Sequence, residues 1–202
     1  MADIKGKPAL VRVIERLRRC RSVDQVMLAT TTNPQDDVLA EVAGVPVYRG
    51  SETDVLGRYA AAARLIGADV VVRITADCPL LDPNVVDRAV YMLKDGVDFV
   101  SNAIVRTFPR GLDVEVMHVD VLQRINRMAY TPNSREHVCT FIYQEQPALF
   151  SVRQLKDIDD NSTLSWELNT EDDLRYIRSI YDDCDYRELV KRCLVGSREK
   201  AQ

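Results

Sequence analysis

Apolar and polar positions follow two different periodicities along the chain. Short β-branched runs, typical of strands, are separated by longer segments in which apolar residues recur every three or four positions, typical of helices. The predicted strands cover residues 24–30, 45–48, 69–74, 98–101, 112–117 and 150–155. The predicted helices cover residues 8–17, 34–43, 55–66, 82–94 and 120–129, with others starting at Ser134 and Thr170 and a last helix ending the fold. Strands separated by helices predict a doubly wound α/β sandwich with an antiparallel excursion after Phe108.

The most informative stretch is the apolar run of residues 70–72 and the turn that follows it. The run predicts a strand buried on both faces in a parallel sheet. Asp82-Pro83 supplies an N-cap and a first-turn proline, so the next helix begins there. Asp77 lies between the two, at the carboxyl end of the strand, where open α/β sheets bind ligands. Asp77 therefore either holds a ligand or a metal, or only caps the turn through the backbone.

Three polar loops follow three of the predicted strands. They span residues 30–33, 49–54 and 75–77, and the topology places them along one edge of the sheet as one crevice. The spacing of Ser51 and Asp54 predicts a capping box for the helix that follows. The side chains are hydroxyls, an amide, arginines and carboxylates, a set that suits a base, a ribose and a metal-bound phosphate. The loops therefore predict a nucleotide-binding crevice.

Composition narrows the class of protein. A chain of 202 residues predicts one domain, here residues 1–195, with a flexible tail at residues 196–202. The net charge of −4 argues against non-specific binding of nucleic acid, which requires an excess of basic residues. No apolar run reaches the roughly 20 residues that a membrane-spanning helix needs. Five scattered cysteines predict free thiols in a reducing cytoplasm. The motifs G-x-G-x-x-G, Walker A and G-x-S-x-G are absent, which argues against dehydrogenases, P-loop kinases and serine hydrolases.

Five blocks of residues, in one order along the chain, carry a resemblance to a known family. The blocks are residues 29–34 (ATTTNP), 48–59 (YRGSETDVLGRY), 72–80 (VRITADCPL), 111–116 (GLDVEV) and 134–138 (SREHV). Together they resemble the spore-coat polysaccharide biosynthesis protein F family, which is similar to the cytidylyltransferases that activate sialic acid and 3-deoxy-manno-octulosonic acid. The resemblance implies a three-layer, mostly parallel, glycosyltransferase-A-like nucleotidyltransferase fold. It also implies transfer of a cytidylyl group from CTP to an acidic sugar, with Mg²⁺ and release of pyrophosphate, in surface polysaccharide biosynthesis.

The resemblance also implies roles for individual residues. Asp77 would hold Mg²⁺, with Asn169 at a second ligand position, and Arg73 and Thr75 would lie near the phosphates. The residues implied for the base and the ribose are Thr30, Asn33, Ser51 and Arg58. The residues implied for the sugar are Asp113, Glu115, Arg135 and His137, with Arg135 pairing the sugar carboxylate. Each of these roles has a structural alternative. Arg58 could be a solvent-exposed helix residue, and Asp113 and Glu115 could form the solvent-exposed face of a strand. His137 could cap a helix or pack against its neighbours.

The sequence departs from the family pattern in two places. The family begins with a strand and a basic loop of the form R-x-x-S-x-R-L-P-G-K, whereas this sequence starts just past that segment. Asn169 stands where the family usually has an aspartate, so the metal position loses a negative charge. We therefore expect little turnover from these residues alone. We also expect a gap in the sheet that exposes backbone groups and favours a homodimer.

Two other functions remain open from the sequence. One is a catalytically silent relative that binds nucleotide or only dimerises. The other is a glycosyltransferase that uses a nucleotide sugar. Such enzymes usually carry an acidic D-x-D motif after the central strand, and residues 75–77 (TAD) lack its first acid.

Overall fold

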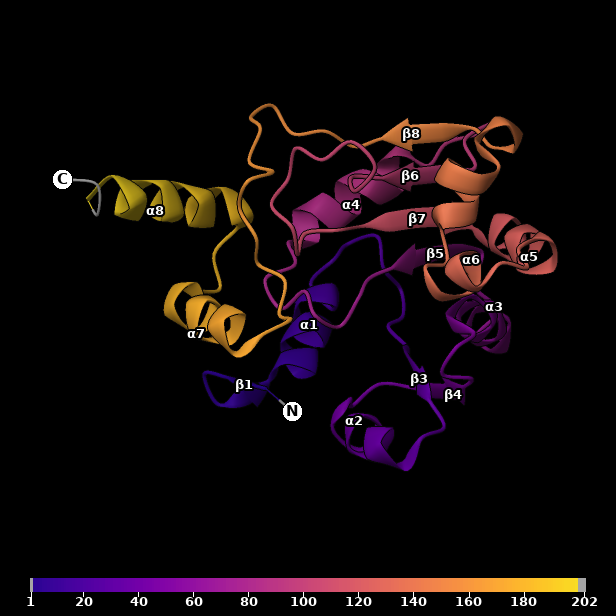
Figure 1. Cartoon of the computed structure of the whole chain (residues 1–202), viewed down its shortest axis with the longest axis horizontal. Helices are drawn as coiled ribbons and strands as arrows, with labels where there is room; N and C mark the ends of the chain where they lie inside the picture. Colours follow the sequence, from indigo (N-terminus) through magenta and orange to yellow (C-terminus); the bar gives the residue numbers. More distant parts are fainter. Residues whose placement is uncertain (1, 200–202) are drawn as a thin grey trace.

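The computed structural model describes residues 2–199, with side chains described up to Leu194. Helices lie on both sides of a set of short strands, as the α/β prediction requires (Figure 1). The strands are β1 (Asp3–Ile4), β2 (Lys7–Pro8), β3 (Leu28–Thr31), β4 (Val47–Gly50), β5 (Val70–Arg73), β6 (Phe99–Ser101), β7 (Glu115–His118) and β8 (Val152–Gln154). The helices are α1 (Ala9–Leu17), α2 (Asp37–Val42), α3 (Val55–Leu65), α4 (Pro83–Met92), α5 (Val119–Met128), α6 (Pro132–Glu136), α7 (Glu171–Ile180) and α8 (Tyr186–Glu199).

The strands form three separate sheets rather than one. β1 and β2 make a two-residue hairpin, and β3 pairs with β4 in parallel. The largest sheet has the order β5-β7-β6-β8, in which β7 runs antiparallel to both neighbours and β8 runs parallel to β6. The antiparallel excursion predicted after Phe108 is therefore confirmed as β7. The other three strands of this sheet run in one direction and β3 is parallel to β4, so the predicted α/β arrangement of mostly parallel strands is also confirmed.

Two hydrophobic clusters cover opposite faces of the largest sheet. Along β6 and β7 successive residues alternate between them, as the two-residue period of a strand requires. Val100 and Val116 join the cluster that contains Trp166 and residues of α4 and α7. Phe99 and Met117 join the cluster formed with α3 and α5. This arrangement gives the three layers, and it orients every second residue of β7 toward one helical layer.

The helix starts that bear on the site follow their sequence signals. Asp82 is the N-cap of α4 and accepts the backbone N–H groups of Asn84 and Val85, so this prediction is confirmed. Thr170 and Asp173 form the predicted capping box of α7. The box predicted for α3 is wrong, because Asp54 itself is the N-cap and accepts the N–H of Gly57, while Ser51 accepts the N–H of Asp54.

Three further predictions about the fold need correction. The run at residues 70–72 is not buried on both faces: Val70 is 37% exposed, because one edge of β5 has no neighbouring strand. The strand predicted over residues 112–117 is shifted and shorter, since only Glu115–His118 pair with neighbours. Helix α8 continues to Glu199, so the tail predicted from residue 196 is helical up to there, and residues 200–202 lie outside the described residues. Within the described residues no helix is long and apolar enough to cross a membrane.

Candidate active site

The turn after β5 holds Asp77 in a defined orientation. Thr75 donates its hydroxyl to Asp77 Oδ1, and the Cys78 thiol approaches the same oxygen at 3.4 Å. The thiol is itself 3.3 Å from the Thr75 hydroxyl oxygen. Both side-chain contacts described for the carboxylate end on Oδ1. The ligand or metal role of Asp77 stays a prediction.

A segment far along the chain places Asn169 beside this turn. The N–H of Leu168 donates to the carbonyl oxygen of Asp77 at 2.9 Å, so Asn169 is the next residue after a direct backbone contact. The N–H of Asn169 in turn donates to Asp173 at the start of α7. The backbones of the two residues implied as metal ligands, 92 positions apart in the sequence, are thus brought close together, and their metal role stays a prediction.

Asp113 joins the same site, together with two residues that the sequence analysis missed. Arg106 holds the Asp113 carboxylate with both guanidinium nitrogens, one at 2.7 Å. Burial, and then the nearby carboxylates of Asp113 and Asp77, raise the pKa of Glu167. The carboxylates of Asp113 and Asp77 thus act on Glu167 electrostatically. No local signal in the sequence marks Glu167, because it lies in an irregular segment that packs beside the turn of Asp77 only in the folded chain.

Gly111 keeps the segment of Glu167 and Asn169 close to the site, and it supports the first prediction. A Cβ on Gly111 would lie 2.7 Å from the carbonyl carbon and oxygen of Trp166, whereas one on Gly96 would meet nothing within 4 Å. Both glycines have a positive φ, so replacement by alanine costs about 1–2 kcal/mol at either position. We expect Gly111→Ala to cost about 1–3 kcal/mol more than Gly96→Ala in urea unfolding, because the 166–169 segment must move. Equal losses would show that the close approach is not structural.

Arg73 and Glu115 do not face the crevice as free groups. They are partners in the β5–β7 ladder and form a salt bridge whose side chains are only 17% and 8% exposed. The guanidinium also lies 5.7 Å from the centre of the Tyr59 ring. Burial opposes the charge of Arg73, but the Glu115 carboxylate outweighs it and raises the pKa of Arg73. Because the two charges are buried against each other, the structure argues against phosphate and sugar roles for this pair, and these roles stay predictions.

The loops predicted to bind the base and ribose lie at the ends of β3 and β4. Thr30 is buried in β3, and the carbonyl of Asn33 accepts a hydrogen bond from Arg49 at 2.9 Å, which ties the two loops together. Ser51 is exposed at the start of the next loop. Arg58 packs its aliphatic chain on Gly50, and its buried Nε has no partner among the described residues. The structure brings these four residues to one end of the β3–β4 pair, and their nucleotide roles stay predictions.

Arg135 and His137 occupy different surroundings. The Arg135 guanidinium donates to Asp54 at 2.7 Å and to carbonyl or amide oxygens of Asn126 and Ala129. Burial opposes ionisation of Asp54, but the hydrogen bond from Arg135 outweighs it and lowers the pKa of Asp54. Arg135 thus ties α6 to the N-terminus of α3, which argues against its predicted role on a sugar carboxylate. The side chain of His137 is exposed, so its sugar role stays a prediction.

The residues beside Asp77 fit a magnesium ion that shares its coordination with a substrate. Mg²⁺ commonly takes one or two protein oxygens and completes its shell with water and phosphate oxygens. Asp77 and Asn169 supply a carboxylate and an amide oxygen, and the closeness of Asp113 and Glu167 leaves negative charge for a cation to offset. Among the side chains that the structure describes, no three His, Cys, Asp or Glu residues form a closed metal site.

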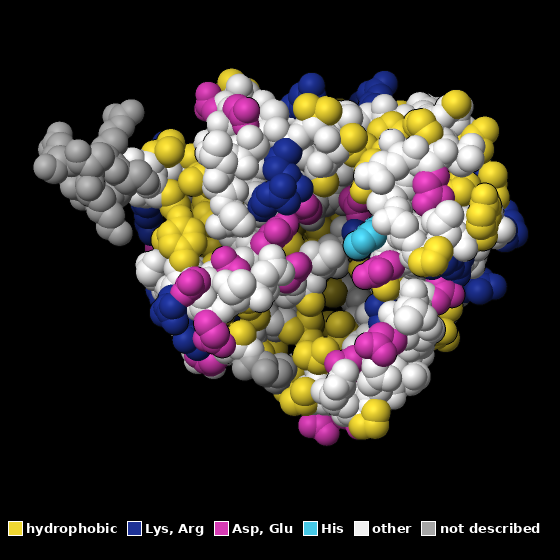
Figure 2. Space-filling view, in the orientation of Figure 1, with side chains coloured by type: hydrophobic (Ala, Val, Ile, Leu, Met, Phe, Trp, Pro, Cys, Tyr) yellow, Lys and Arg dark blue, Asp and Glu magenta, His cyan; other side chains and the backbone are white. Residues whose placement is uncertain are grey.

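One face of the molecule is hollowed at its centre. Figure 2 shows this hollow with acidic side chains around it and hydrophobic side chains on its floor. A metal-compatible acid at a strand end, with hydroxyl and arginine side chains on the neighbouring loops, is the arrangement expected of a site for phosphate esters. The fold and the site together define an α/β protein of the nucleotidyltransferase class.

The comparisons with known proteins agree with this class and name the family. A family model described as cytidylyltransferase matches residues 1–170, so the chain belongs to the cytidylyltransferase family. The structure of a cytidylyltransferase from Leptospira borgpetersenii is similar, with a TM-score of 0.92 and 27% identity over 97% of this chain and 87% of that one. A CMP-2-keto-3-deoxy-manno-octonic acid synthetase solved with CTP shares the fold, with a TM-score of 0.64 and 16% identity over 88% of each chain.

Curated relatives extend the comparison. An uncharacterised protein of Methanocaldococcus jannaschii is 38% identical over 71% of this chain and 59% of its own length. The spore coat polysaccharide biosynthesis protein SpsF of Bacillus subtilis is 29% identical over 83% of this chain and 71% of its own. A 3-deoxy-manno-octulosonate cytidylyltransferase of an Anaeromyxobacter species is 34% identical over 51% of this chain and 43% of its own. The chain thus spans about three fifths of the first relative.

Proposed function

We propose that this chain serves the transfer of a cytidylyl group from CTP to an acidic sugar, with release of pyrophosphate, in surface polysaccharide biosynthesis. The observation that carries the proposal is the backbone contact between Leu168 and Asp77, which sets Asn169 beside Asp77 at the crevice. The names of the relatives support it, since they include a 3-deoxy-manno-octulosonate cytidylyltransferase and a spore coat polysaccharide protein.

In this proposal one group of residues binds the nucleotide and another group binds the sugar. Thr75 orients the Asp77 carboxylate through its hydrogen bond to Oδ1. A magnesium ion bound there would neutralise the triphosphate and polarise the α-phosphorus for attack by a sugar hydroxyl. On the nucleotide side, Arg49 joins the two loops and so holds Asn33 and Ser51 at a fixed separation. Positioning and charge neutralisation of this kind supply most of the catalysis in phosphoryl-type transfers.

The sugar side needs a cation other than Arg135, whose guanidinium is occupied. Arg106 is held by Asp113. Arg110 is exposed, and it is among the charges that act on Glu167. Its backbone is fixed, because it exchanges hydrogen bonds with Leu164 and Trp166 at 3.0 and 2.8 Å. We therefore assign recognition of the sugar carboxylate to Arg110, since a guanidinium pairs a carboxylate with two parallel hydrogen bonds.

A pyrophosphate-release assay with CTP, Mg²⁺ and a panel of nonulosonic and ulosonic acids tests this function. It is run on the 202-residue chain and on the same chain preceded by a strand and basic loop taken from a relative. We expect more turnover from the extended chain than from the shorter one, because a triphosphate carries several negative charges and additional basic groups help to neutralise them.

Replacing CTP by UTP or ATP provides the control, and it should abolish the signal. If the extended chain neither binds CTP nor releases pyrophosphate with any of the sugars, the proposal is wrong and a silent relative is the better description. Robust turnover by the 202-residue chain would instead show that the phosphates are neutralised by groups other than a basic loop.

A further inference from the structure

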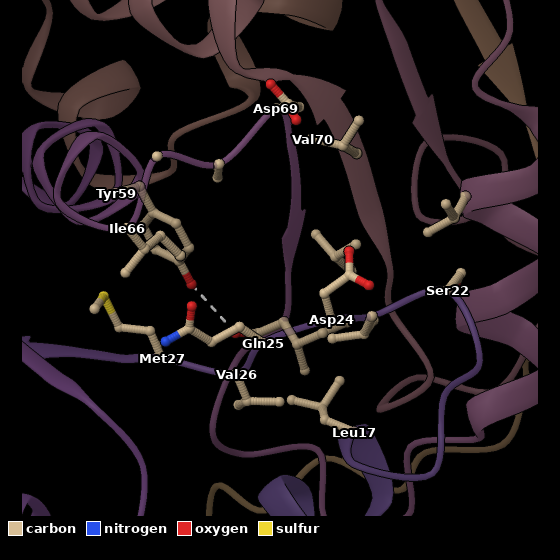
Figure 3. A pocket seen from close by; sticks show the side chains of 16 residues that line it. Leu17, Ser22, Asp24, Gln25, Val26, Met27, Tyr59, Ile66, Asp69 and Val70 are labelled. Atoms are coloured by element: carbon tan, nitrogen blue, oxygen red, sulfur yellow. Dashed lines mark hydrogen bonds between the residues drawn. The ribbon is translucent and has the colours of Figure 1, made fainter.

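Two hollows outside the candidate active site differ in their chemistry. The hollow between β3 and β5 has a volume of about 430 Å³, and Figure 3 shows apolar side chains such as Val26 and Ile66 along its walls. The other has a volume of about 320 Å³ and lies where α1 meets the connection between α7 and α8. This volume is at the lower end of the roughly 300–1,000 Å³ that small-molecule sites occupy. The second hollow is lined mainly by charged groups.

Four basic side chains, two acidic ones and one aromatic ring line this second hollow, which we call the α1 cavity. They are Lys7, Arg12, Arg16, Arg19, Glu15, Asp183 and Tyr181. Glu15 pairs with Lys7, and Asp183 pairs with Arg19. The next acid along the connection, Asp182, is bonded by Arg192 at 2.6 Å. The lining of the cavity therefore carries an excess of two positive charges.

Arg16 is a buried cation without a carboxylate of its own. It is only 2% exposed, and its terminal nitrogens donate to the backbone oxygens of Leu81 and Asp182 at 3.1 and 2.6 Å. Its Nε has no hydrogen-bond partner among the described residues. The ion pairs at the cavity are formed by its neighbours instead. A buried charge is costly unless an opposite charge and hydrogen bonds compensate it, so Arg16 lacks an anion.

Arg12 adds a second guanidinium to the same cavity. The guanidinium carbons of Arg12 and Arg16 lie 4.9 and 5.5 Å from the centre of the Tyr181 ring. The ring attracts both cations but neutralises neither. Arg12 donates to two backbone oxygens, and its ion pair with Glu15 is long, at 3.5 Å. The two arginines are also four residues apart on α1, a spacing at which like charges destabilise a helix.

We propose that the α1 cavity binds a phosphate group, either free phosphate or the phosphate of a small molecule. A phosphate carries close to two negative charges near neutral pH, which matches the excess charge of the cavity. Guanidinium groups bind phosphate oxygens through parallel hydrogen bonds, and such an anion would relieve the repulsion between Arg12 and Arg16.

The α1 cavity is a site apart from the Asp77 crevice. Helix α7 begins at Glu171, close to Asn169, and its ten residues carry the chain roughly 15 Å onward to Tyr181. The proposal therefore does not rest on the transfer of a cytidylyl group, and it can be tested without CTP or a sugar.

Isothermal titration of inorganic phosphate into the 202-residue protein tests the proposal, in a chloride buffer of constant ionic strength. Ribose 5-phosphate is the second probe, and ribose is its uncharged control. Equal affinity for both phosphates would assign the site to the phosphate alone. Tighter binding of ribose 5-phosphate would show that the cavity also recognises an attached group. Either result supports the proposal if the shifts of backbone NMR signals centre on residues 12–19 and 181–183.

Exposed cations at the cavity provide variants that keep the fold. Lys7→Gln and Arg19→Gln each remove a charge whose side chain is 47% or 48% exposed. We expect each to weaken phosphate binding about fivefold, the effect of roughly one charge interaction at contact distance. Arg127→Gln is the matched control, because Arg127 is exposed on α5 and does not line the cavity. It should leave the affinity unchanged.

Removal of an acid should have the opposite effect. Glu15→Gln releases Lys7 from its ion pair, so we expect phosphate to bind about threefold more tightly or better. Glu41→Gln on α2 is its control, since Glu41 is exposed and does not line the cavity. Absence of binding by both phosphates overturns the proposal. So do equal effects of the cavity and control variants, or NMR shifts confined to the crevice around Asp77.

Discussion

Replacing Asp77 by alanine should abolish Mg²⁺-dependent nucleotide binding while the protein remains folded. Asp77 is the only carboxylate that directly follows β5, and Asn169 beside it contributes no charge. Loss of the carboxylate removes the anionic oxygen that a metal–triphosphate would need, so we expect CTP affinity with Mg²⁺ to fall by roughly 100-fold or more. Asp77 itself is half-buried and its side chain bonds only to Thr75 and Cys78 among the described residues, so the unfolding midpoint should change little.

The measurement is isothermal titration of CTP with and without Mg²⁺ into both proteins. Asp95→Ala is the matched control, because Asp95 is exposed in the turn before β6 and far in sequence from the site. We expect the control to bind as the unmodified protein does. Unchanged affinity in a folded Asp77→Ala variant would remove Asp77 from the site and with it the metal position inferred here.

The largest effect on stability is expected from Arg73→Met. The substitution leaves the Glu115 carboxylate buried without its partner, and breaking a buried ion pair in this way costs about 3–5 kcal/mol. The double variant Arg73→Met/Glu115→Leu should recover much of the loss, because two apolar side chains can replace a buried pair at little cost. Urea unfolding followed by circular dichroism measures the three free energies of unfolding.

An exposed ion pair serves as the comparison for that experiment. Arg175 and Asp172 form a salt bridge with side chains 70% and 82% exposed, so Arg175→Met should leave the unfolding midpoint almost unchanged. If Arg73→Met is no more harmful than Arg175→Met, the Arg73–Glu115 pair is not a buried element of the β5–β7 ladder. The phosphate-side role of Arg73 would then be open again.

Local signals in the sequence were sufficient where a feature depends on neighbouring residues. The start of α4 at Asp82 and the capping box of α7 at Thr170 follow from short-range hydrogen bonds between a side chain and the next turn of backbone. Asp77 could be placed at a strand end for the same reason. The sequence could not show that Arg73 and Arg135 are held by Glu115 and Asp54, because these partners lie 42 and 81 residues away and no local pattern shows them.

The amino-acid sequence by itself determined the alternation of strands and helices, the turn that presents Asp77, and the motifs of the cytidylyltransferase family. These depend on periodicity and capping, which act over a few residues. Only the tertiary structure decided that Glu167 joins Asp77 and Asp113, that Arg73 is buried against Glu115, and that β3 and β5 stand apart. Each of these depends on which distant segments pack together, and the backbone contact of Leu168 with Asp77 is set by the shared core around Trp166, not by any nearby residue.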